Sequence, residues 1–181
     1  MEILIIALPL LASIISGFFG KFIGDRNSEI VTSFLVTISA VLSIVIFYEV
    51  IFNQYEDNIT IATWIDSGSL NVNWSIKIDS LSAVMLVVVT SVSSLVHIYS
   101  IGYMSHDPHK PRFMAYLSLF TFAMLMLVTS DNFIQLFFGW EGVGLCSYFL
   151  IGFWFKKDTA NSAAIKAFLV NRVGDFGFAL G

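Results

Sequence analysis

Charged side chains are scarce in this sequence. Only 12% of its 181 residues are Asp, Glu, Lys or Arg, whereas soluble globular domains carry about 25%. Hydrophobic residues make up 57% of the chain, and its mean hydropathy is +0.83. This composition excludes an ordinary soluble domain and predicts an all-α polytopic membrane protein.

Cysteine is almost absent as well, because Cys146 is the single thiol. One thiol excludes an internal disulfide and a cysteine-rich zinc or iron–sulfur site, so no metal centre is predicted. We expect Cys146 to be a small apolar residue of the core. The sequence also lacks a Gly-rich phosphate loop, and nothing in it predicts nucleic-acid binding. The N-terminus lacks a basic region and a cleavage pattern, so the first apolar run is predicted to be retained.

Long apolar runs predict six transmembrane helices, each approaching the ~20 residues that cross a bilayer. Asp131 is expected to cap the fifth helix, and Asp158 or Thr159 the sixth. The polar stretch GDRNSE is expected to be a loop between the first two helices. The chain reaches Gly181 inside an apolar pattern, so we expect it to be a fragment of a longer polypeptide. The predicted spans cover residues 2–19, 30–52, 80–101, 113–129 and 131–155, and begin again at 160.

The second span is unusually rich in hydroxyl side chains. These side chains can return hydrogen bonds to their own helix. They are Thr32, Ser33, Thr37, Ser39 and Ser43.

Residues 59–79 alternate between apolar and polar side chains on both sides of the turn Asp66-Ser67-Gly68-Ser69. A period of two around a Gly-bearing turn predicts a β-hairpin. An open hairpin would leave unpaired backbone groups in lipid, so this one is expected outside the membrane, over the helix bundle. The sequence thus divides into residues 1–58 (first two helices), 59–79 (hairpin) and 80–181 (remaining helices).

The basic residues of the connections predict an orientation. Six of them fall in the loops after the first, third and fifth spans, whereas the connection that holds the hairpin contains only Lys77. The positive-inside rule then places the N-terminus and hairpin on the outer side. The six are Lys21, Arg26, Lys110, Arg112, Lys156 and Lys157.

Glu141 is the most informative residue, because it lies near the middle of the apolar run 131–155. At 1.5 Å per residue it is about 15 Å from the helix start, near the midplane of a ~30 Å hydrocarbon core. An acid there costs roughly 3 kcal/mol on the insertion scale. No partner is available at i±3 or i±4, so Glu141 either pairs with another helix or is neutral. Such an acid, held between burial and a nearby cation, can gain and lose a proton. Gly139, Gly142 and Gly144 around it are expected to let another backbone come close.

The sixth span adds Lys166, Arg172 and Asp175. Arg172 and Asp175 share a helical face and can pair, at a depth similar to that of Glu141. This pair either takes part in proton transfer or only fixes helix packing. Lys166 lies on the opposite face, nearer the inner side, and can snorkel. His97 is a further proton-path candidate near the inner end of the third span, whereas His106 and His109 are expected in a solvated loop.

Three stretches resemble the antiporter-like subunit of respiratory complex I, which is chain L in bacteria and subunit 5 in mitochondria. They read SLVHIYSIGYMSHDPHKPRFMAYLSLFTFAMLMLVTSDNF, LFFGWEGVGLCSYFLIGFW and KAFLVNRVGDFGFALG. The likeness continues through the hairpin and first spans. The combination of GWEGVG and NRVGD is specific to this subunit.

The resemblance implies a proton-translocating membrane subunit of NADH:quinone oxidoreductase, with no redox centre in this chain. NADH, FMN, iron–sulfur clusters and quinone would be bound by partner subunits, and sister antiporter-like subunits would flank this one. It implies that Glu141 is the central acid of the fifth helix and pairs with a Lys on a seventh helix, while Arg172 and Asp175 serve proton transfer or coupling. The membrane would be the bacterial or mitochondrial inner membrane, with the N-terminus facing the periplasm or intermembrane space.

Two other interpretations remain. One is an Mrp-type or stand-alone cation/proton antiporter subunit. The other is a structural membrane subunit in which Glu141 is locked in a salt bridge.

Overall fold

The computed structural model describes residues 1–68 and 70–181. In these residues it contains six helices and one antiparallel pair of strands between the second and third helices, which confirms the predicted fold. The elements are α1 (Glu2–Ile23), α2 (Asp25–Asn53), β1 (Asp57–Ser67), β2 (Leu70–Ile78), α3 (Ser80–Tyr103), α4 (Lys110–Val128), α5 (Phe133–Ile151) and α6 (Asp158–Leu180).

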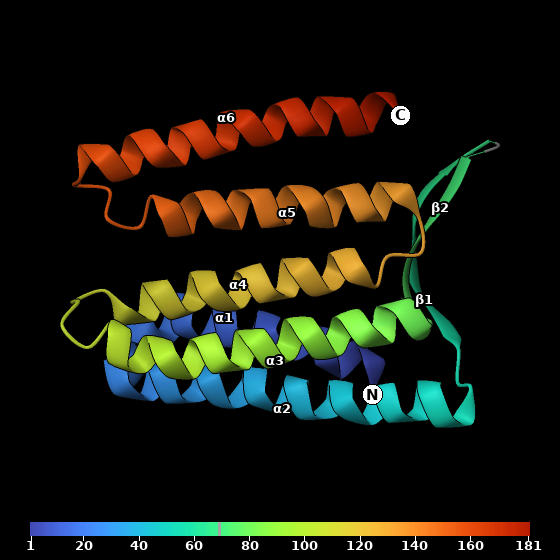
Figure 1. The fold of residues 1–181 in the computed structure, drawn as a ribbon, viewed down its shortest axis with the longest axis horizontal. Helices are drawn as coiled ribbons and strands as arrows, with labels where there is room; N and C mark the ends of the chain where they lie inside the picture. The colour runs from blue at the N-terminus through green and yellow to red at the C-terminus, as the bar shows by residue number, and fades with distance from the viewer. Residues whose placement is uncertain (69) are drawn as a thin grey trace.

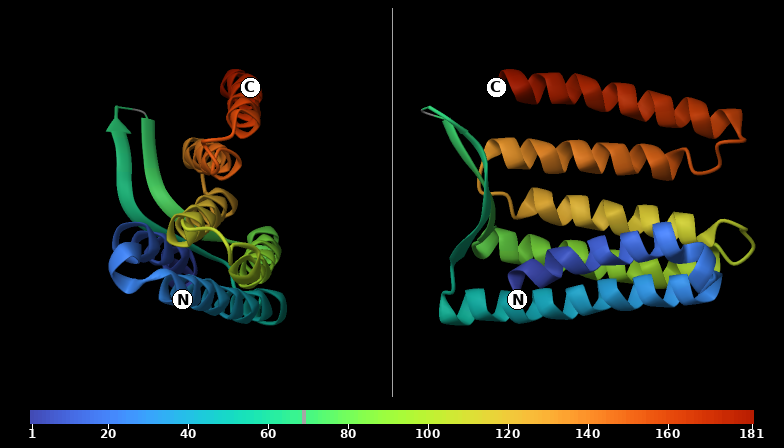
Figure 2. Two further views of the ribbon diagram at one scale, coloured as in Figure 1. Left: turned by 90° about the vertical axis from the view of Figure 1, so that its left-hand side faces the viewer. Right: turned by 180° about the vertical axis from the view of Figure 1, so that it is seen from behind.

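The helices lie side by side, and the hairpin crosses one end of the bundle (Figure 1). Seen end-on, α1 to α4 form a cluster, and α5 and α6 extend from it one after the other (Figure 2). α5 packs on α4, and α6 packs mainly on α5. The connections α1–α2, α3–α4 and α5–α6 share the end opposite the hairpin, which we call the loop end.

In the described part of the chain, five helices, α1 to α5, are long and apolar enough to cross a membrane. The chain is therefore an integral membrane protein. α6 is also 23 residues long, but it carries Asp158, Lys166, Arg172 and Asp175 and falls below the hydropathy of the others. α6 lies beside α5 and corresponds to the sixth helix that the sequence predicts.

Several predicted boundaries were wrong. The expected GDRNSE loop is helical apart from Gly24, whose φ of 87° makes the turn between α1 and α2. Polar residues therefore extend both helices beyond their apolar runs. Asn132, not Asp131, caps α5, because its side chain accepts a hydrogen bond from the Gln135 amide at 2.8 Å. α6 begins at Asp158 after Lys157 without a side-chain cap, so the predicted caps Asp158 and Thr159 lie inside the helix.

Hydroxyl groups join α2 to its neighbours as well as to itself. Thr37 donates to the Ser33 carbonyl at 2.7 Å and is 2.8 Å from Ser94 Oγ on α3. Ser39 instead donates to the Ile5 carbonyl of α1 at 2.7 Å. The hydroxyl groups of α2 therefore form hydrogen bonds within their own helix, as the sequence allows, and also with α1 and α3.

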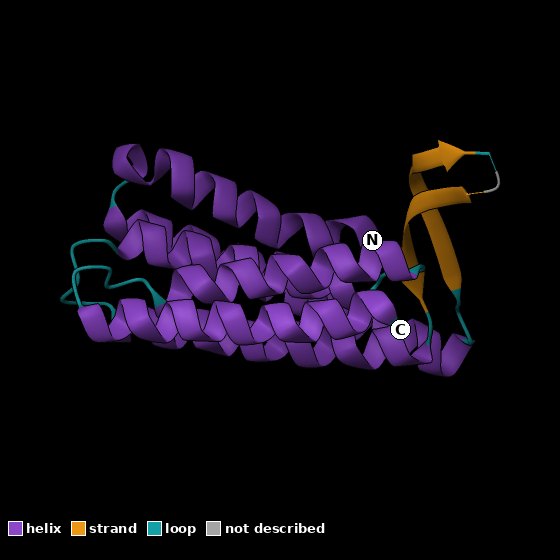
Figure 3. Cartoon of the chain, turned by 90° about the horizontal axis from the view of Figure 1, so that it is seen from above, coloured by secondary structure: helices purple, strands orange, loops and turns teal. Residues whose placement is uncertain are grey.

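The hairpin stands across one end of the helices (Figure 3). Polar contacts dock it on the end of α4 and the start of α5. The buried amide of Gln135 donates to the Ser75 carbonyl at 2.7 Å and accepts from the Ser75 amide at 3.0 Å. Asn132 donates to the Asn73 carbonyl at 2.8 Å, and the Lys77 amide donates to the Thr129 carbonyl at 2.9 Å. β2 is thereby fixed to the start of α5. Of the predicted turn, Ser69 lies outside the described residues.

Asp79 joins the hairpin to α3. Its carboxylate caps the helix by accepting a hydrogen bond from the Ser82 amide at 2.8 Å. That bond lowers the pKa of the Asp79 carboxyl, because it stabilises the charged form.

We predict that Gln135→Ala loosens the hairpin. The substitution leaves the Ser75 amide and carbonyl without partners, at a cost of about 1–3 kcal/mol. Trypsin cleavage after Lys77 should become on the order of tenfold faster, since local opening exposes the site. Asn71→Ala, at an exposed hairpin position that pairs with Asp66 and not with Lys77, is the control and should leave cleavage unchanged. Equal rates in all three proteins would contradict the docking role of Gln135.

Candidate functional site: an ion cluster between helices α5 and α6

Glu141 lies in the middle turns of α5 and faces α6. The Arg172 guanidinium on α6 donates to its carboxylate through Nη1. The absence of a partner on α5 left two possibilities, a partner on another helix or a neutral acid, and the structure has the partner on another helix.

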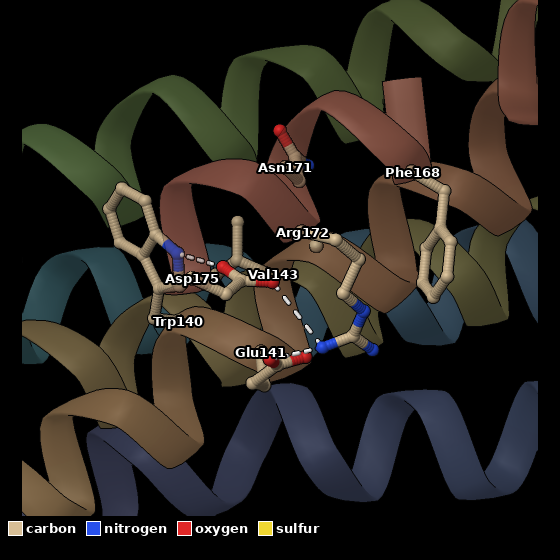
Figure 4. A pocket seen from close by; sticks show the side chains of 8 residues that line it. Trp140, Glu141, Val143, Phe168, Asn171, Arg172 and Asp175 are labelled. Carbon is tan, nitrogen blue, oxygen red and sulfur yellow. Dashed lines mark hydrogen bonds and ion pairs between the residues drawn. The ribbon is translucent and has the colours of Figure 1, made fainter. Parts of the chain in front are cut away.

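Arg172 contacts a second carboxylate at the same time. Its Nη1 lies 3.3 Å from Asp175 Oδ2, one turn further along α6. Asp175 also accepts a hydrogen bond from Trp140 Nε1 at 2.8 Å. Figure 4 shows Arg172 reaching toward both acids, with the Trp140 indole turned to Asp175. One guanidinium thus bridges two carboxylates from neighbouring helices.

The cluster borders a pocket between α5 and α6 whose walls are largely apolar. Phe168 and Val143 are among its lining residues, and the guanidinium carbon of Arg172 lies 4.6 Å from the Phe168 ring centroid. Asp175 is 10% exposed, Glu141 27% and Arg172 48%. The two acids are therefore the more enclosed partners of the cluster, and Arg172 is the more exposed one.

Small residues set the distance between α4 and α5. A Cβ at Gly139 would lie 2.7 Å from the Leu127 backbone, and one at Gly142 would lie 3.2 Å from the Ala123 Cβ. The close approach expected at these glycines is confirmed. At Gly144 the nearest atom is 3.7 Å away, an ordinary contact. Gly139 therefore fixes α5, and with it Glu141, against α4.

The structure does not bring the other predicted residues to this cluster. His97 is fully buried between α3 and α4, where Nδ1 lies 2.8 Å from the Ser93 carbonyl oxygen and Nε2 3.0 Å from Ser118 Oγ. Lys166 is exposed on α6, away from Asp175. Cys146 is buried in the core. In residues 1–68 and 70–181, no three His, Cys, Asp or Glu side chains gather as metal ligands.

Sequence reasoning missed two members of the site. Trp140 is the hydrogen-bond donor to Asp175, and Phe168 is the aromatic surface below Arg172. Phe168 lies four residues before Arg172, a helical spacing that was available in the sequence. The Trp140 contact crosses between helices, so only packing reveals it.

Two family models match the chain. The model for complex I chain 5, N-terminus, matches residues 64–114, and the model for the NADH:quinone oxidoreductase/Mrp antiporter transmembrane region matches residues 130–181. The NADH-ubiquinone oxidoreductase chain 5 of Arabidopsis thaliana is 60% identical over the whole chain. The NADH-quinone oxidoreductase subunit L of Rickettsia bellii is 54% identical over 99% of it. Over its whole length the chain is therefore similar to members of the chain 5/subunit L family.

Against these two family members, the chain spans 27% and 28% of their lengths. Two solved structures share its fold. One is the archaeal membrane-bound sulfane sulfur reductase, with a TM-score of 0.80, 18% identity and coverage of 99% of this chain and 35% of that one. The other is the Mrp complex of a Dietzia species, with a TM-score of 0.81, 22% identity and coverage of 99% and 18%. At these identities the likeness concerns the fold alone.

We predict that Gly139→Ala destabilises the full-length subunit. The added methyl group meets the Leu127 backbone and must separate α4 from α5, at about 1–3 kcal/mol, the cost of overpacking. Thermal unfolding in detergent measures the effect. Gly102→Ala is the matched control, because nothing lies within 4 Å of a Cβ there. A Gly139→Ala protein that unfolds at the wild-type temperature would refute the close approach.

Trp140→Phe should weaken the site through Asp175 alone. The phenyl ring keeps most of the bulk of the indole but cannot donate the hydrogen bond to the buried carboxylate. That bond is worth about 1.5–3 kcal/mol. A double-mutant cycle with Asp175→Ala, which removes the acceptor, should give a coupling of that size when unfolding of the full-length subunit is measured. Trp154→Phe, which removes a hydrogen bond to Asp107 instead, should show no coupling to Asp175→Ala. Additive effects of Trp140→Phe and Asp175→Ala would contradict this role.

Proposed function

We propose that this chain is part of a proton-translocating membrane subunit of NADH:quinone oxidoreductase. The supporting observation is the Arg172 guanidinium that bridges Glu141 and Asp175 between two helices. The family supports the same function, since the relatives above are named as subunits of this oxidoreductase. Residues 1–58 would form the first two spans, 59–79 an outer hairpin, and 80–181 the start of the antiporter-like domain.

Glu141 is the proposed proton-binding group. As a carboxylate it holds Arg172, and when a proton binds to one of its oxygens the ion pair is lost. Arg172 then keeps its charge–charge contact with Asp175 only. Moving the cation between two acids couples the protonation of Glu141 to the position of a charge on α6.

Asp175 and Arg172 serve as the second half of this exchange. Asp175 holds the cation while Glu141 is neutral, and the Trp140 hydrogen bond keeps its carboxylate oriented. Release of the proton restores the Glu141–Arg172 pair. His97 and Lys166 are proposed as secondary members of the route toward the loop end.

The larger assembly follows from the family. We propose that the chain binds no redox cofactor, that NADH, FMN, iron–sulfur clusters and quinone are bound by partner subunits, and that sister antiporter-like subunits lie beside it. The membrane would be a bacterial or mitochondrial inner membrane. The loop end, with its basic residues, would face the cytoplasm or matrix, and the N-terminus and hairpin the outer side.

Glu141→Gln tests the proposal in the assembled complex reconstituted in vesicles. We expect NADH-driven quinone reduction and proton uptake to fall together by roughly tenfold or more, because a general acid–base group contributes about 100-fold or more. Glu56→Gln, in the exposed loop before β1, removes the same charge and should leave both rates unchanged. An assembled Glu141→Gln complex that pumps normally would make the acid structural. A proton flux that requires sodium would instead indicate a cation/proton antiporter.

A further inference from the structure

A second hollow lies at the loop end, far along α5 from the ion cluster. It is formed by the α3–α4 connection, the start of α4 and the α5–α6 connection. Its walls carry the cations Arg112, Lys156 and Lys157, and a single carboxylate, Asp107. The function proposed above uses none of these residues.

The one carboxylate of the hollow is already engaged. Asp107 Oδ2 accepts a hydrogen bond from Trp154 Nε1 at 2.9 Å, and Oδ1 accepts one from the His109 amide at 2.8 Å. In the described residues, none of the three cations forms an ion pair. The hollow therefore has an excess of positive charge.

Arg112 is held in place with part of its donor set unused. Its Nη2 donates to the Phe153 carbonyl at 3.2 Å, and its guanidinium carbon lies 4.7 Å from the Phe153 ring centroid. Its Nε is buried and has no partner among the described residues. A buried N–H without an acceptor costs free energy, so an acceptor oxygen entering the hollow would be stabilised there.

An apolar groove adjoins this charged hollow. It runs between α4, α5 and α6 and shares Arg112, Phe153 and Phe155 with the hollow. Toward the middle of the bundle its walls are mostly aromatic or aliphatic, including Tyr116, Phe149 and Ile165. The cationic hollow thus continues into the apolar groove at the loop end of the membrane-spanning helices.

We propose that this site binds an anionic phospholipid, with its phosphate among Arg112, Lys156 and Lys157 and an acyl chain along the α4–α5–α6 groove. Charge complementarity identifies the head as an anion, and the adjoining groove distinguishes a lipid from a free anion. Trp154 and Phe155 border the head site, and aromatic side chains are typical of the membrane interface. Basic pockets between transmembrane helices on the cytoplasmic or matrix side bind lipid phosphates through the same charge attraction.

The test uses the complete complex in vesicles of phosphatidylcholine that contain a photoreactive phosphatidylglycerol. We expect label on the peptide that carries residues 153–157. The double variant Lys156→Gln/Lys157→Gln, at exposed positions, should bind this lipid about 30-fold more weakly, the equivalent of about 1 kcal/mol for each lysine. Titrating unlabelled phosphatidylglycerol against the label measures the change.

The matched control is Arg26→Gln/Lys77→Gln, which removes the same charge at exposed positions outside the hollow. It should retain wild-type labelling. Equal labelling by photoreactive phosphatidylcholine, or displacement by inorganic phosphate, would overturn the lipid assignment. So would a helix of the complete subunit seen to fill the groove. These outcomes leave the proton function of Glu141 untouched, because they concern other residues.

Discussion

The structure depends on how a charge in an apolar helix is neutralised. Glu141 has no partner on α5, and Arg172 on α6 supplies one while also holding Asp175. Since α6 packs mainly on α5, this ion cluster links the two helices, together with aromatic contacts such as that of Phe137 with Phe178. The free energy of the cluster is the balance between the desolvation of the charged groups and their Coulomb attraction. The cluster is a structural link between α5 and α6, and it is also the proposed proton-binding site of the chain.

The position of the cluster depends on the position of α5. That helix is held by α4 along its length and by the hairpin at its start. Gly139 lets α5 approach the Leu127 backbone of α4. At the start of the helix, Asn132 and Gln135 bind the backbone of β2. Trp74 of the hairpin packs against Phe138, with ring centroids 5.0 Å apart. The hairpin is therefore part of the support of Glu141, although it lies at the end of the bundle.

The sequence allowed the architecture to be predicted because long apolar runs and period-two alternation are strong signals. Glu141, Arg172 and Asp175 could be predicted to lie at the same level of the membrane. The short connection makes α5 and α6 antiparallel, and the three residues are at similar distances along these helices. Helix ends were poorly predicted, because polar residues such as those around Gly24 remain helical outside an apolar run. Side-chain contacts between helices, such as Trp140 with Asp175, depend on the rotation of each helix about its axis. Hydropathy does not determine that rotation.

The cluster contains more negative than positive charge, and this limits the states it can adopt. With both acids ionised, the single guanidinium of Arg172 balances the charge of only one of them. Arg172 is 48% exposed while Asp175 is 10% exposed, so a further group can approach from the open side of the pocket. The family resemblance predicts a Lys from a seventh helix as the partner of Glu141. Such a Lys would compete with Arg172 for the same carboxylate. Competition of two cations for one acid would let Glu141 exchange partners without ever being left as an isolated charge.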